Sequence, residues 1–158
     1  MWHGILIAGH AVAGLIALVS GLVTIRNGRL FDTYLTALAA MTVFLVFAIG
    51  VEWGALDTTA RVLFTAFAGL AAVMLWRAGR ARRDRPAAAS RPSASYVDHV
   101  GFTLVALFDA FVVIAVLDLG APIWAVVGAG VLIAVAGHFA LRRAERVLTG
   151  PERQWSTR

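Results

Sequence analysis

The chain has 158 residues, of which 60% are hydrophobic, and its mean hydropathy of +0.81 leaves too little polar surface for a water-soluble globule. The net charge is +5, but all 14 basic residues are arginines that cluster beside apolar runs, so anionic lipid headgroups are the expected partners and nucleic acid is not. The lack of cysteine excludes disulfides, thiolate metal sites and cysteine nucleophiles.

The first apolar run, residues 2–25, is long enough to cross a bilayer and predicts a transmembrane helix. Its first arginine follows the run, whereas a cleaved signal peptide has basic residues before it. Histidines and small residues recur along the run at helical spacing, so one face is expected to admit a close neighbouring helix and to turn His10 toward the protein interior. That face holds His3, His10, Gly14, Ala17 and Gly21.

The segment HAVAGLIALVSG, from His10 to Gly21, precedes Arg26-Asn27-Gly28 and a second apolar run. A first-helix histidine followed by small residues and a basic, glycine-containing loop resembles a family of small multi-pass bacterial membrane proteins of unknown function. The likeness covers mainly the first half of the chain, and the loop histidine of that family is missing here. The resemblance implies a multi-pass membrane fold and no particular activity.

Four more apolar runs follow, at about 33–53, 58–76, 96–119 and 121–141, each of a length that suits a membrane span. Residues 77–95 are rich in arginine, proline, alanine and serine and predict a flexible polar loop, while arginines stop the last run and begin a tail over 142–158. We therefore predict an all-α integral membrane protein, a single transmembrane domain over 1–158 that forms a bundle of five transmembrane helices.

The arginines also predict the orientation of the bundle. On alternate sides of the predicted spans, 13 of the 14 arginines fall on the side of the loop and the tail, and Arg61 alone falls on the other. Because cytoplasmic segments carry the excess of positive charge, we expect the N-terminus outside and the C-terminus inside a bacterial plasma membrane. Aromatic residues predict an outer interface belt and an inner one, respectively Trp2, Trp53 and Trp124, and Tyr34, Trp76 and Tyr96.

Asp109 is the clearest candidate for a functional group, because a charged side chain near the bilayer centre costs about 2.5–3.5 kcal/mol on insertion scales. It lies about ten residues, or ~15 Å, from the outer end of its span, and His10 lies about eight residues, or ~12 Å, from the outer end of the first span. If these helices are neighbours, the two side chains form a catalytic acid/base pair. The alternatives are a structural hydrogen bond between helices for Asp109 and a hydrogen bond to a neighbouring backbone carbonyl for His10.

A hydrophobic ligand is expected to bind beside this pair. The candidate substrate-binding residues lie on the outer side of the predicted bundle or next to Asp109; they are His3, Glu52, Trp53, Phe108 and Phe111. An acidic vestibule near the outer surface would be lined by His3, Glu52, Asp57 and Asp118. The alternative is that these carboxylates are exposed loop groups with no such role. No ligand-spacing motif for a metal is present, so no metal site is predicted.

His99 and His138 lie near the inner ends of the last two spans at similar depth. This spacing allows a b-type haem held by two histidines, which is the only cofactor the sequence suggests. The alternative is a pair of interfacial histidines with hydrated tips. Asp98 is either their partner or a helix cap.

The leading hypothesis is a membrane-embedded enzyme of the isomerase, cyclase or hydrolase type, in which Asp109 and His10 act on a lipid-like substrate. The first alternative is a proton-coupled transporter of small molecules, with the same pair as a protonation switch. The others are electron transfer through haem or quinone, and a subunit whose arginine loop docks another protein. A homo-oligomer fits any of them.

Overall fold

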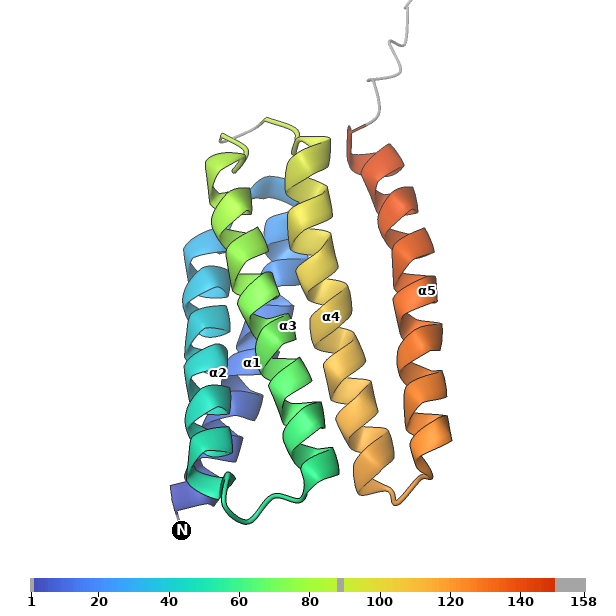
Figure 1. Ribbon diagram of the computed structural model, residues 1–158. Helices are drawn as coiled ribbons and strands as arrows, with labels where there is room; N and C mark the ends of the chain where they lie inside the picture. The colour runs from blue at the N-terminus through green and yellow to red at the C-terminus, as the bar shows by residue number, and fades with distance from the viewer. Residues whose placement is uncertain (1, 88–89, 150–158) are drawn as a thin grey trace, which may run out of the picture.

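The computed structural model describes residues 2–87 and 90–149, with side chains from residue 4 onward. These residues form five helices and no strand, and each helix is long and apolar enough to cross a membrane. This confirms the prediction of an all-α, multi-pass membrane protein in contact with lipid. The helices are α1 (Trp2–Asn27), α2 (Phe31–Glu52), α3 (Thr58–Arg83), α4 (Ala94–Asp118) and α5 (Ile123–Thr149) (Figure 1).

The helices run past the apolar segments that predicted them. Residues 77–83, expected in the flexible loop, form the last turns of α3, and α5 continues through residues 142–149 of the predicted tail. Arginine is a good helix former, and its positive charge is favoured near a helix C-terminus, where the backbone dipole is negative. An apolar run therefore marks where the chain meets lipid but underestimates the length of the helix.

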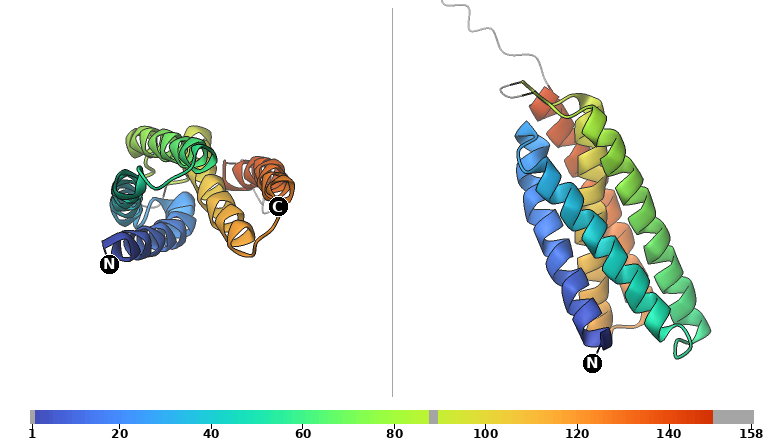
Figure 2. Two further views of the ribbon diagram at one scale, coloured as in Figure 1. Left: turned by 60° about the horizontal axis from the view of Figure 1, so that its bottom comes forward. Right: turned by 90° about the vertical axis from the view of Figure 1, so that its left-hand side faces the viewer.

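Four of the helices form a ring, in which α1 packs against α2, α2 against α3, α3 against α4, and α4 back against α1. Helix α5 lies outside this ring, and its extensive contacts are with α4 (Figure 2). One end of the bundle collects every described arginine except Arg61, and we call it the arginine end. The opposite end carries Glu52, Asp57 and Asp118, and we call it the acidic end.

The core is concentrated toward the arginine end. Phe31, Tyr34 and Tyr96 are fully buried there, with ring centroids 5.8 Å apart for Phe31 and Tyr34 and 6.1 Å apart for Phe31 and Tyr96. Tyr96 donates its hydroxyl hydrogen to the backbone oxygen of Thr24 at 3.0 Å. The prediction that both tyrosines belong to an interface belt is therefore wrong, because sequence position gives their depth but not the direction in which their side chains point.

The small-residue face of α1 does admit neighbouring helices, as predicted. A β-carbon at Gly14 would stand 3.2 Å from Phe111 of α4 and 3.3 Å from Met41 of α2. At Gly21 it would stand 2.6 Å from Leu104 and 3.2 Å from Tyr34. Because no side chain intervenes at these positions, α2 and α4 both approach the backbone of α1 closely.

The turns at the arginine end are tied to one another by Arg85. Its Nε donates to the backbone oxygen of Gly28 at 3.1 Å, and its Nη1 lies 2.9 Å from Oδ2 of Asp32. Gly28 has a φ of +67°, a conformation that favours glycine, and Pro86 packs against it. The α1–α2 turn and the α3–α4 loop are thus held together, which closes this end of the ring.

Candidate functional site

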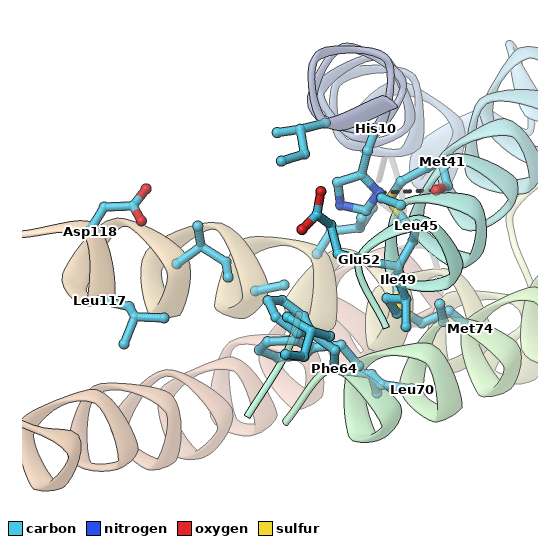
Figure 3. A pocket seen from close by; sticks show the side chains of 18 residues that line it. His10, Met41, Leu45, Ile49, Glu52, Phe64, Leu70, Met74, Leu117 and Asp118 are labelled. Carbon is cyan, nitrogen blue, oxygen red and sulfur yellow. Dashed lines mark hydrogen bonds between the residues drawn. The ribbon is translucent and has the colours of Figure 1, made fainter. Parts of the chain in front are cut away.

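A pocket of about 460 Å³ lies inside the ring of four helices (Figure 3). Its wall combines residues of α1, α2, α3 and α4 and is mainly aliphatic, aromatic or methionine. The pocket extends from the level of Met74 and Leu107, where the core begins, to Leu56 and Asp118 at the acidic end. Its volume is typical of sites for small organic ligands, which are roughly 300–1,000 Å³.

His10 contributes a polar group to this apolar wall. Its Nδ1 lies 3.0 Å from the backbone oxygen of Met41 on α2. A carbonyl oxygen only accepts hydrogen bonds, so Nδ1 must carry the hydrogen, and in the neutral ring Nε2 carries the lone pair. The contact with α2 therefore fixes both the tautomer and the orientation of the imidazole.

Glu52, the last residue of α2, lies on the same side of the pocket as His10. Its carboxylate points toward the imidazole, on the side of the ring away from the Met41 carbonyl (Figure 3). Asp118, at the end of α4, also lines the pocket, farther toward the acidic end. A half-buried imidazole with a carboxylate beside it is an arrangement suited to accepting and returning a proton.

Asp109 lies outside this pocket. Its carboxylate faces α5, where a β-carbon added to Gly130 would stand 3.6 Å from Oδ1 and 3.9 Å from Oδ2. Oδ1 is buried and has no hydrogen-bond partner among the described residues. Its neighbour Ala110 turns to the pocket instead. The structure therefore does not bring Asp109 and His10 together.

The remaining candidate substrate-binding residues have other surroundings. Phe111 packs against Gly14, and Phe108 has 52% of its surface exposed on the outside of the bundle. Trp53 lies under the guanidinium of Arg61, 5.6 Å from its ring centroid, and does not line the pocket. The side chain of His3 is outside the described residues.

Asp57, assigned to the vestibule, caps α3. Its Oδ1 accepts a hydrogen bond of 2.7 Å from the backbone nitrogen of Ala60, which satisfies one of the free amides at the start of the helix. Within residues 4–87 and 90–149, no three histidine, aspartate or glutamate side chains come close enough together to hold a metal ion.

His99 and His138 do not fit a haem. Arg77 donates its Nε hydrogen to Nδ1 of His99 at 3.2 Å, so Nε2 of the neutral ring carries a hydrogen and no lone pair for iron. His138 is exposed beside Phe139. Between the levels of the two histidines, Leu141 packs onto Gly101 and Val105 onto Gly137, so α4 and α5 are too close to enclose a porphyrin.

Asp98 is not a helix cap, because Ser93 caps α4 by accepting a hydrogen bond from the backbone nitrogen of Tyr96 at 3.2 Å. It pairs instead with Arg77, whose guanidinium also stacks 4.4 Å from the ring centroid of Phe102. Arg77, expected in the loop, thus joins α3 to α4 near the arginine end.

Helix α3 contributes a part of the pocket wall that was not among the residues predicted from the sequence. The face that includes Phe64, Phe67, Ala71, Met74, Ala78 and Ala81 repeats at alternating spacings of three and four residues, which is the signature of one helix face turned to the protein interior. The residues of this face nearest the acidic end line the pocket, and Ala78 and Ala81 are fully buried in the core. The spacing alone was enough to find this face.

Comparisons of the chain with models of known protein families, with curated proteins and with solved structures gave no significant match. The resemblance of the first helix and its loop therefore identifies no family.

Proposed function

We propose that this membrane protein binds a hydrophobic small molecule in the pocket enclosed by helices α1, α2, α3 and α4, and that His10 and Glu52 perform acid/base chemistry on it. The observation that carries the proposal is the placement of an oriented imidazole, with the Glu52 carboxylate beside it, in the wall of a mainly apolar cavity among membrane-spanning helices. Side chains of this kind are costly inside a bilayer unless they have partners or a function.

The chemistry proposed for the site is proton transfer. In its neutral form His10 accepts a proton through Nε2, and the nearby carboxylate of Glu52 stabilises the imidazolium that results. An apolar wall strengthens this electrostatic interaction because it excludes water. Isomerisation, cyclisation and hydrolytic opening of a lipid-like substrate need such a pair. Glu52 takes the role in it that the sequence suggested for Asp109.

The proposal is tested by purifying the protein in a mild neutral detergent and identifying co-purified small molecules by mass spectrometry. We expect a hydrophobic compound from the unmodified chain and much less of it from Ala48→Phe, which fills the pocket from α2. The matched control is Ala72→Phe, at an exposed position of α3 outside the pocket wall. Equal recovery from all three proteins would contradict a ligand in this cavity.

A proton-coupled carrier is the second candidate, because the pocket reaches the acidic end while Tyr34, Tyr96 and Leu104 close the ring toward the arginine end. A cavity that reaches one end only is also expected of one state of an alternating-access transporter. Uptake of the co-purified compound into proteoliposomes that follows an imposed pH gradient would favour the carrier. Chemical conversion without uptake would favour the enzyme.

We also propose an orientation. The concentration of arginine at one end of the bundle supports a cytoplasmic arginine end in a bacterial plasma membrane, by the rule that positive charge is retained inside. The N-terminus and the acidic end, and with them the pocket, would then face outward.

A further inference from the structure

We propose that the ligand of this pocket enters from the lipid phase, through an opening between α1 and α4 in the half of the bilayer at the acidic end. This inference rests on the proposed function, since it names the class of molecule that the same pocket takes: one that is dissolved in the membrane and carries a hydrocarbon chain. The observation that carries it is that α1 and α4 pack together toward the arginine end and separate toward the acidic end.

Helices α1 and α4 are in contact over the half of the bundle nearer the arginine end. The hydroxyl of Tyr96 on α4 donates to the backbone oxygen of Thr24 on α1 at 3.0 Å. Farther along, a β-carbon at Gly14 of α1 would stand 3.2 Å from the ring of Phe111 on α4. The small-residue face of α1 thus holds α4 from the arginine end as far as the level of Phe111.

Past this level, the cavity lies between the two helices. Ile7 and Asp118 are equally far along α1 and α4 from the last of these contacts, and both line the pocket. Helix α1 stays packed on α2 over this stretch, since a β-carbon at Gly9 would stand 3.0 Å from the ring of Phe44. Helices α1 and α4 therefore diverge toward the acidic end, as Figure 1 and the left view of Figure 2 show.

Among the described helices, none closes the side of the cavity between α1 and α4. Helices α2 and α3 form the opposite part of the wall, and the extensive contacts of α5 are with α4. The rim of this side is apolar and accessible: Ile7 is 49% exposed although it lines the pocket, and Phe111 is 37% exposed although it contacts α1. An apolar rim on membrane-spanning helices faces lipid chains, so the opening joins the cavity to the bilayer.

The deep end of the pocket suits a hydrocarbon chain. It is lined by Met41, Met74 and Leu107, each of which is at most 5% exposed. Methionine side chains adapt their shape to different apolar groups. A chain that moves from the bilayer to this wall exchanges one apolar environment for another, so it needs no passage through water. Entry by this route brings a membrane-dissolved molecule to His10, whereas lipid outside the bundle does not touch the three buried residues.

The experiment is photolabelling of the full-length protein in phosphatidylcholine vesicles that contain a phosphatidylcholine with a diazirine at the end of one acyl chain. This probe stays in the bilayer, and mass spectrometry maps the labelled residues. We expect label on Met41, Met74 and Leu107. Ile7→Trp adds bulk at the rim and should lower this labelling by about tenfold or more, because overpacking opposes entry. Val12→Trp, at an exposed position of α1 outside the pocket wall, is the matched control and should leave the labelling unchanged.

Two further measurements make the outcomes separable. Leu56→Trp adds bulk at the acidic end and should leave labelling by the phospholipid unchanged. Dodecanol with the same diazirine, added to the protein in neutral detergent, tests the pocket without a bilayer. If dodecanol labels the three buried residues but the phospholipid does not, or if Leu56→Trp lowers labelling by the phospholipid and Ile7→Trp does not, the lateral opening is refuted and the pocket stands. If neither probe labels them above the level of Ala48→Phe, the proposed function fails and the inference with it.

Discussion

At the scale of single residues, His10 shows how a polar group is made tolerable in an apolar interior. One ring nitrogen is committed to the Met41 carbonyl, while the other faces the pocket on the side of Glu52. This hydrogen bond is compatible with the helical structure of α2, because a backbone oxygen in a helix can accept a second hydrogen bond. Nδ1 thus fixes the orientation of the imidazole through the backbone of α2, and Nε2 is the nitrogen that can react in the cavity.

Replacement of His10 by phenylalanine is expected to separate these two roles. Loss of the hydrogen bond to Met41 should cost about 0.6 kcal/mol of unfolding free energy, the average for such bonds between membrane helices. Turnover of the co-purified substrate should fall roughly 100-fold or more, as for loss of a general base. The stability is measured by titration with a denaturing detergent. His138→Phe, at an exposed position, is the control, and unchanged turnover in His10→Phe would refute the proposed role.

Asp109 presents the opposite case, a buried carboxyl oxygen with no described partner, which faces the backbone of α5 at Gly130. We expect Asp109→Asn to leave the unfolding free energy unchanged or to raise it, by no more than about 3 kcal/mol, because it removes a carboxylate that is costly at this depth. The same detergent titration checks this. A clear loss of stability would mean instead that the carboxyl supports the contact between α4 and α5.

At the scale of helices, the size of the inward-facing residues sets the shape of the ring. From Gly14 to Gly21 the inner face of α1 is small, with Gly14, Ala17 and Gly21, and it holds α2 and α4 close. The inner face of α3 changes along its length, from phenylalanine at the pocket to the fully buried Ala78 in the core. Small residues allow helices to approach, so the ring is tight at the arginine end and wider toward the acidic end.

This view predicts that added bulk on the inner face of α1 disrupts the ring. Gly21→Leu should destabilise the protein by about 1–3 kcal/mol or more, since even its β-carbon would meet Leu104 at 2.6 Å and the side chain would overpack the core. Gly69→Leu on α3 has no neighbouring atom within 4 Å of its β-carbon and should be tolerated. Equal detergent resistance of the two variants would show that the close contact of α1 with α2 and α4 is not needed.

At the scale of the whole molecule, the positive charge and the tightest packing lie at the same end of the bundle. The arginine end is tightly packed and is joined across its turns by Arg85, whereas the pocket extends toward the acidic end, where Leu56 and Asp118 line it. The buried core lies between the pocket and the arginine end.

The orientation of the molecule is testable because the chain has no cysteine. Single cysteines introduced at Ala55, in the α2–α3 loop, and at Ser90, in the α3–α4 loop, are both at exposed positions. With the N-terminus outside, a membrane-impermeant maleimide should label the first in intact cells and the second only after lysis. The reverse pattern would place the arginine end outside and contradict the proposed orientation.

Much of the fold was predictable, because burial in lipid imposes long apolar runs that can be read directly. The candidate site was predictable only in part. The depth of His10 follows from counting along a helix, but its partner does not, since Glu52 and Asp109 differ in which way their helices turn them. The same limit applies to Tyr34 and Tyr96, whose depth suggested an interface and whose direction placed them in the core.

Amino-acid order alone was enough to predict a helical membrane protein, the five helices of residues 2–87 and 90–149, and the face of α1 that accepts neighbours. Those features depend on hydrophobic length and local spacing, which each segment carries alone. The three-dimensional packing was needed to find that α1 to α4 form a ring, that α5 lies outside it, and that His10 shares a cavity with Glu52 while Asp109 faces α5. These features depend on the rotation of each helix about its axis and on which helices become neighbours, and both are settled by packing among segments far apart in the chain.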